Sequence, residues 1–156
     1  MNTTDSPKTS GIVTSAYVIT LFFLALSGFG QMPIFKRYYI ADIPGLAWLA
    51  NFYVTHYIHY LGAVIILALT AYLTAVYLMP YRSQRKVTVT GYLRAGLLAG
   101  ILVTGALLVI RNSLFAPFSP NTVIFLDLSH LFLVMLFLMV ALFCLVFRKR
   151  WSVAAS

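Results

Sequence analysis

The chain has 156 residues, of which 62% are hydrophobic and 9% are charged, and its mean hydropathy is +0.93. A soluble domain has about a quarter of its residues charged, so this composition excludes an ordinary soluble protein and favours one that resides in a lipid bilayer. The net charge of +8 comes from basic residues at the ends of apolar segments. Membrane topology and anionic lipid explain that placement, so we do not expect nucleic-acid binding.

Four apolar runs are each long enough to cross about 30 Å of hydrocarbon as a helix. Strand-like alternation at the spacing of a β-barrel does not recur, which favours helices. The sequence therefore predicts an all-α membrane protein, a single domain over residues 1–156 that forms a four-transmembrane-helix bundle. The predicted spans are residues 11–30, 49–79, 91–110 and 122–147.

The first span follows the polar residues 1–10 and ends in the small residues Ser27–Gly30. Small residues permit the close approach of a neighbouring helix or of a flat cofactor, for which Gly28 is a candidate contact. A simple glycine-rich helix exit is the alternative. A cleavable signal peptide is less favoured, because the segment before the span is barely basic.

The connections between spans carry further signals. Residues 31–51 are amphipathic and contain basic and aromatic side chains typical of a membrane interface. Pro80 is expected to end the second span. Gly96 and Gly100, at GxxxG spacing, predict a face that packs against the second or fourth span. The pair Ser119–Pro120 predicts a helix N-terminus.

The lysines and arginines are divided unequally between the two sides of the membrane. With four spans, both termini and the connection between the second and third spans share one side. Eight basic residues on that side against three on the other predict that both termini are cytoplasmic. The eight are Lys8, Arg82, Arg85, Lys86, Arg94, Arg148, Lys149 and Arg150, and the three are Lys36, Arg37 and Arg111.

Two of the three histidines, His56 and His59, lie one helical turn apart in the second span, and His130 lies in the fourth. An ionisable side chain inside a membrane is costly and by default marks a functional site, and imidazole is a common ligand of haem iron. At about 1.5 Å per residue, His59 lies roughly 30 Å from the inner end of its span near Met79, and His130 roughly 27 Å from Arg148. The similar depths predict one haem b in the outer half of the membrane, with His59 and His130 as its axial ligands.

Other roles for these polar residues stay open. The histidines could simply hydrogen-bond within the bundle, or bind zinc or non-haem iron with Asp127 as the only further ligand. His56 could bound a quinone pocket, contact a haem propionate or face the interface. Arg111 could neutralise a propionate, anchor the interface or pair with Asp127, which is otherwise a candidate proton relay. Cys144 is the single cysteine, so an iron–sulfur centre would have to lie on another subunit.

The chain resembles the b-type cytochrome subunits of respiratory formate dehydrogenases and, more distantly, those of nickel–iron hydrogenases. The likeness lies in the order and spacing of four features: the end of the first span at Ser27–Gly30, His59 before a glycine and an aliphatic run, the segment Phe115–Pro117, and His130 at 15 residues beyond Phe115. In that family an outer haem takes one histidine from the second span and one from the fourth. The resemblance therefore implies the same role for His59 and His130.

The family's inner haem takes histidines from the first and fourth spans, at positions that fall here near Thr14 and Cys144. Neither is histidine, so the resemblance implies an outer haem only and argues against the family's inner-side quinone site. It implies an anchor and electron-transfer subunit of a respiratory complex in the bacterial inner membrane, with no catalytic constellation of its own. Its partners would be an iron–sulfur or c-type cytochrome subunit on the outer face and menaquinone or ubiquinone. A cofactor-free structural subunit is the alternative; a small transporter is disfavoured, because no internal repeat is evident.

Overall fold

The computed structural model describes five segments of the chain, which are residues 11–32, 34, 39–81, 85–111 and 118–154. Several features singled out from the sequence lie outside these residues. They are the polar N-terminal residues 1–10, the basic residues Lys36, Arg37 and Arg82, and the segment Phe115–Pro117.

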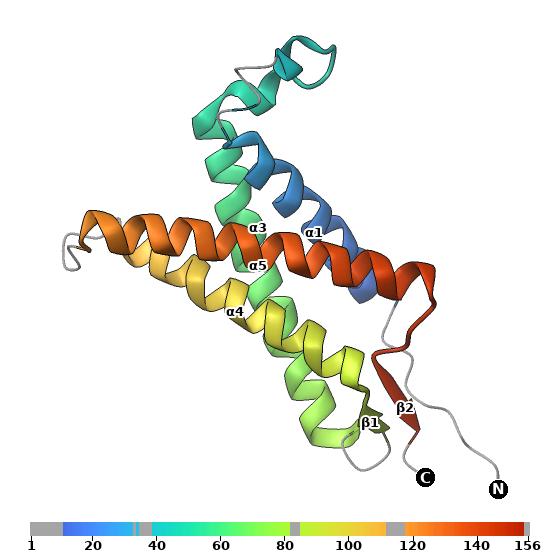
Figure 1. The fold of residues 1–156 in the computed structure, drawn as a ribbon. Helices are drawn as coiled ribbons and strands as arrows, with labels where there is room; N and C mark the ends of the chain where they lie inside the picture. The colour runs from blue at the N-terminus through green and yellow to red at the C-terminus, as the bar shows by residue number, and fades with distance from the viewer. Residues whose placement is uncertain (1–10, 33, 35–38, 82–84, 112–117, 155–156) are drawn as a thin grey trace, which may run out of the picture. The chain divides into compact units, whose positions relative to one another are not determined.

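Four long apolar helices dominate the structure (Figure 1). Each is long and apolar enough to cross a membrane, α3 together with the turn that follows it as far as Met79, which confirms the four predicted apolar helices. The chain forms two compact units, of which unit 1 ends at Ala75 and unit 2 begins at Val76. The helices are α1 (Gly11–Gly30), α3 (Phe52–Val76), α4 (Val89–Arg111) and α5 (Pro120–Val146).

Side-chain caps determine where three of these helices begin. Asn51, Thr88 and Ser119 each accept a backbone N–H from the first turn of the following helix, at 3.1, 3.1 and 3.3 Å respectively. Such bonds satisfy donors that the first turn of a helix leaves unpaired. As a result α3 begins three residues later than predicted, and α4 and α5 each begin two residues earlier. The helix start at Ser119–Pro120 is confirmed.

In unit 1, the connection between the helices packs onto the end of α1. Leu49 is buried there, and a Cβ at Gly30 would lie 3.0 Å from Leu49 Cδ2 and 3.1 Å from Thr55 Cγ2. The small residues at the end of α1 therefore allow close helix packing, as the sequence predicts. The connection includes two short 3-10 helices, η1 (Ile40–Asp42) and η2 (Ala47–Ala50).

In unit 2, α4 and α5 pack against one another, and their axes diverge towards the start of α4 and the end of α5 (Figure 1). A Cβ at Gly100 of α4 would lie 3.2 Å from Leu133 Cδ1 of α5. A Cβ at Gly96 would meet no atom of the described residues within 4 Å. Gly100 of the predicted GxxxG face therefore packs against α5, whereas packing at Gly96 stays a prediction.

Two backbone features depart from the prediction. Beyond α3 the chain continues as a π-helical turn, η3 (Tyr77–Tyr81), which includes Pro80. Proline lacks the N–H that would continue an α-helix. The α-helix therefore ends at Val76, and one wider, π-helical turn follows it. Strand β1 (Arg85–Val87) also pairs antiparallel with β2 (Ser152–Ala154). The all-α prediction missed this two-stranded ribbon, whose strands have three residues each and lie outside the four apolar runs.

Candidate cofactor-ligand histidines

In unit 1, the side chain of Ser27 on α1 forms a hydrogen bond with His59 on α3. Ser27 Oγ lies 3.1 Å from His59 Nδ1 and 2.6 Å from the carbonyl oxygen of Phe23. A carbonyl oxygen only accepts hydrogen bonds, so the single hydroxyl proton of Ser27 goes to Phe23 and a lone pair faces the ring. Assigned from this network, the proton of the neutral His59 ring is on Nδ1, which donates it to Ser27. The lone pair of the imidazole is then on Nε2.

In unit 2, Thr104 of α4 holds His130 of α5 in the same way. Thr104 Oγ1 lies 2.9 Å from His130 Nδ1 and 2.8 Å from the carbonyl oxygen of Gly100. The hydroxyl proton again goes to the helix backbone, so His130 Nδ1 donates and Nε2 carries the lone pair. A metal-ligating histidine almost always donates its other ring N–H to a fixed acceptor, which sets the tautomer and the ring orientation. Both histidines have such an acceptor, and both equally fulfil the alternative in which the histidines hydrogen-bond within the bundle.

A glycine directly follows each hydroxyl residue and borders the same ring. A Cβ at Gly28 would lie 3.2 Å from His59 Cε1, and a Cβ at Gly105 would lie 3.3 Å from His130 Cε1. These distances are shorter than ordinary carbon–carbon contacts, so a larger residue would push the ring aside. The structure therefore places Gly28 beside a candidate ligand, and it adds Gly105, which the sequence analysis did not single out.

The two units thus repeat one local design. His59 follows Ser27 by 32 residues, and His130 follows Thr104 by 26 residues. In each unit a hydroxyl residue and a glycine on the first helix receive a histidine from the second. The signal that could have revealed this design is a Ser-Gly or Thr-Gly dipeptide in one apolar helix and a histidine in the next.

No protein-family model, curated protein or solved structure matches this chain. The resemblance to cytochrome b subunits therefore rests on the residues themselves. Among the described residues, His, Cys, Asp and Glu side chains form no group of three or more that could hold a metal ion.

His56 lies one turn before His59 on α3 and is held by a side-chain amide. Gln31 Nε2 donates to the carbonyl oxygen of Ser27 at 3.3 Å, which leaves Gln31 Oε1 3.2 Å from His56 Nδ1. That oxygen only accepts, so His56 also carries a proton on Nδ1. The ring stacks on Phe52, with centroids 5.1 Å apart. The quinone-pocket and propionate roles of His56 stay predictions.

Arg111, in the last turn of α4, pairs with Asp127, one turn before His130 on α5. Arg111 Nη1 lies 3.3 Å from Asp127 Oδ2 and 3.4 Å from Oδ1. The pairing offsets the cost of a carboxylate within an apolar span. Of the roles considered from the sequence, ion pairing is the one that the structure contains. Propionate binding by Arg111 and proton transfer by Asp127 stay predictions.

Proposed function

We propose that this chain is a haem b-containing membrane anchor and electron-transfer subunit of a respiratory oxidoreductase complex in the bacterial inner membrane. It would connect an iron–sulfur or c-type cytochrome subunit on the outer face with menaquinone or ubiquinone. The observation that carries the proposal is the matched state of His59 and His130. A hydroxyl oxygen lies 3.1 Å from Nδ1 of His59 and 2.9 Å from Nδ1 of His130, which assigns the lone pair of each neutral ring to Nε2.

The donor set fits haem b. Two imidazoles would suffice to hold a haem iron, whereas a zinc site with two histidines would need further protein ligands. We therefore propose one haem with His59 and His130 as axial ligands. When bound, haem would supply a one-electron carrier, and the chain would supply ligands, apolar surroundings and local charge.

The other residues of the two sites would act on the ligands. Ser27 and Thr104 would accept the hydrogen bond from Nδ1–H of each ring and so keep each ring in the tautomer whose Nε2 can bind iron. Gly28 and Gly105 leave the space that lets each ring lie against the neighbouring helix. Arg111 is the candidate for a propionate contact, because a guanidinium binds carboxylates with paired N–H donors.

A pyridine haemochrome assay with iron quantitation on the purified full-length chain tests the proposal. We expect haem b in the wild type and loss of the reduced-minus-oxidised b-type spectrum in His59→Ala and in His130→Ala. His56→Ala removes the remaining histidine and is the matched control, which should keep the spectrum. A normal spectrum in either ligand variant rejects the ligand assignment. Two results together would instead support the cofactor-free structural subunit. The wild-type chain would contain no haem, and cells that lack the chain would fail to assemble a larger complex.

A further inference from the structure

The turn that follows α5 has an arginine where glycine is usual. The N–H of Lys149 donates to the carbonyl oxygen of Cys144 at 2.9 Å, and the N–H of Arg148 donates to that of Leu145 at 3.3 Å. These two bonds define a Schellman motif, whose left-handed position normally holds glycine. Arg148 occupies it with a φ of 50°, a conformation that costs free energy for any residue with a Cβ. The chain thus places a cation where an uncharged glycine would be less strained.

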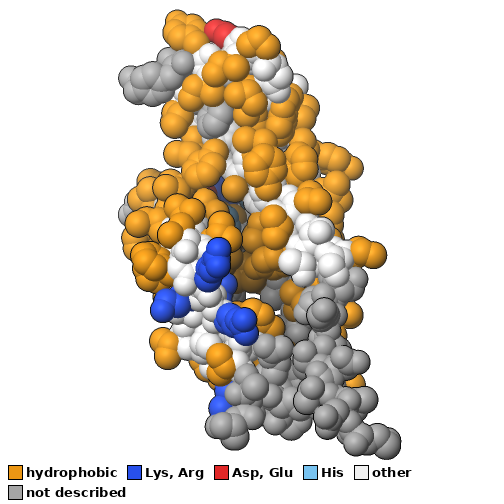
Figure 2. Space-filling view, turned by 90° about the vertical axis from the view of Figure 1, so that its right-hand side faces the viewer, with side chains coloured by type: hydrophobic (Ala, Val, Ile, Leu, Met, Phe, Trp, Pro, Cys, Tyr) orange, Lys and Arg blue, Asp and Glu red, His pale blue; other side chains and the backbone are white. Residues whose placement is uncertain are grey.

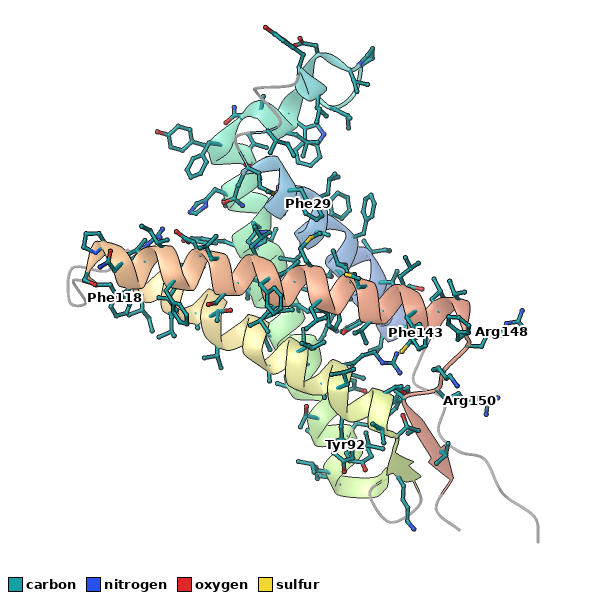
Figure 3. All side chains as sticks on the ribbon, viewed as in Figure 1. Phe29, Tyr92, Phe118, Phe143, Arg148 and Arg150 are labelled. Atoms are coloured by element: carbon teal, nitrogen blue, oxygen red, sulfur yellow. The ribbon has the colours of Figure 1, made fainter. Side chains whose placement is uncertain are left out.

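Hydrogen bonds fix the backbone of this basic turn to the start of α4. The Thr88 N–H donates to the Trp151 carbonyl oxygen at 3.0 Å, and Thr88 Oγ1 donates to the Arg150 carbonyl oxygen at 2.8 Å. The backbone approach is so close that a Cβ at Gly91 would collide with the Trp151 carbonyl. Figure 3 shows Arg148 and Arg150 projecting outward from this turn. The positions from which the cations project are therefore defined by the fold.

A shallow and open hollow of about 520 Å³ lies beside these cations, between residues 88–90 at the start of α4 and the turn 147–150, with Val153 also in its wall. The side chains of Arg148, Lys149 and Arg150 are exposed. Among the described residues, no carboxylate pairs with them. The acidic side chain of unit 2 is Asp127, which pairs with Arg111 near the other end of α5. Three clustered positive charges therefore lack a side-chain counter-charge within their unit.

Exposed apolar side chains border the same hollow. Phe147 is 60% exposed and Val89 is 86% exposed. Figure 2 shows lysine and arginine side chains gathered beside hydrophobic ones. Trp151, which directly follows this turn, meets Tyr77 edge to face with ring centroids 6.1 Å apart. Such aromatic residues are enriched at the headgroup level of a membrane. A ligand that matches these features has an anionic head and an apolar tail.

We propose that this hollow is a binding site for an anionic phospholipid. Arg148, Lys149 and Arg150 would surround the headgroup phosphate, and an acyl chain would lie along Phe147 and Val89. Basic pockets between transmembrane helices are known to bind anionic headgroups through this combination of charge and apolar surface. The proposal does not depend on haem binding.

Native mass spectrometry of the full-length chain in a non-ionic detergent, titrated with phosphatidylglycerol, tests this site. Phosphatidylcholine and inorganic phosphate serve as the neutral-lipid and free-anion comparisons, and we expect neither to bind at the concentration at which phosphatidylglycerol does. Arg148→Gly is the decisive variant, because it removes one charge and also relieves the backbone strain. We expect its affinity for phosphatidylglycerol to fall about five-fold, while its thermal midpoint does not fall.

The matched control is Lys86→Gln on β1, which removes the same charge from an exposed lysine outside the lining of the hollow. It should keep the wild-type affinity. An equal loss in Lys86→Gln and Arg148→Gly would mean diffuse attraction to positive charge and would overturn the site. Phosphatidylcholine binding as tight as phosphatidylglycerol would overturn the role of the cations. Displacement of the lipid by an equal concentration of inorganic phosphate would overturn the lipid assignment in favour of a free anion.

Discussion

Replacing Thr104 with valine tests whether the hydroxyl acts on the ligand. Valine has nearly the shape of threonine, so the packing of α4 on α5 should persist while His130 Nδ1 loses the acceptor that lies 2.9 Å away. A buried donor left without its acceptor costs about 1–3 kcal/mol. Loss of such a partner from a metal-ligating histidine typically weakens metal binding about 10–100-fold. We therefore expect haem to dissociate from Thr104→Val about 10–100-fold more readily.

The same variant should raise the midpoint potential of the haem. The hydrogen bond from Nδ1 makes the imidazole a stronger donor and so favours ferric iron. If about 1 kcal/mol of that preference is lost, a one-electron couple shifts upward by about 40 mV. Thr104→Ser, which keeps the hydroxyl, should stay near the wild-type potential.

A spectroelectrochemical titration of the purified chain, together with transfer of haem to an acceptor protein, measures both quantities. Unchanged potential and haem retention in Thr104→Val, with haem present, would refute the role of the hydroxyl. Such a result would leave the haem proposal itself standing, whereas haem-free wild type would remove that proposal instead.

Three further predictions follow from contacts in the two units. Gly91→Ala should destabilise the chain by about 1–3 kcal/mol, because the added methyl overlaps a backbone carbonyl of the C-terminal segment. Gly96→Ala, which adds a methyl in open space, should not, and equal thermal midpoints for the two variants would contradict the close contact. Gly28→Val should lower the haem content by displacing the ring of His59, whereas wild-type content in the haemochrome assay would show that the ring tolerates the change. Asp127→Asn should slow quinone turnover of the assembled complex while its haem content stays intact; unchanged turnover would reject a proton-relay role.

The sequence predicted the four helices because apolar length is a property of each segment alone. It could not place their ends to within a residue, since these depend on which nearby side chain caps the first turn. Nothing in the sequence marks Asn51 and Thr88 as helix caps. The structure shows that their side-chain oxygens accept N–H groups from the first turns of α3 and α4. The pairing of β1 with β2 could not be predicted either, because β2 lies more than sixty residues further along the chain.

His59 and His130 were predictable as candidate ligands because an ionisable ring in an apolar span is costly. Their partners were not, because serine and threonine inside a helix usually bond back to their own backbone. Ser27 and Thr104 do the same, at 2.6 and 2.8 Å. Only the packing of the helices shows that the remaining lone pair of each hydroxyl faces an imidazole.

The packing next to the histidines differs between the units in one respect. In unit 1 the bulky residue is Leu24 on the first helix and the glycine is Gly62 on the second, whereas in unit 2 Gly100 is on the first helix and Leu133 on the second. If α1 were to pair with α5 in this register, Leu24 and Leu133 would compete for one space. If α4 were to pair with α3, Gly100 would face Gly62 and leave a void. The exchange of large and small residues therefore disfavours these two exchanged pairings.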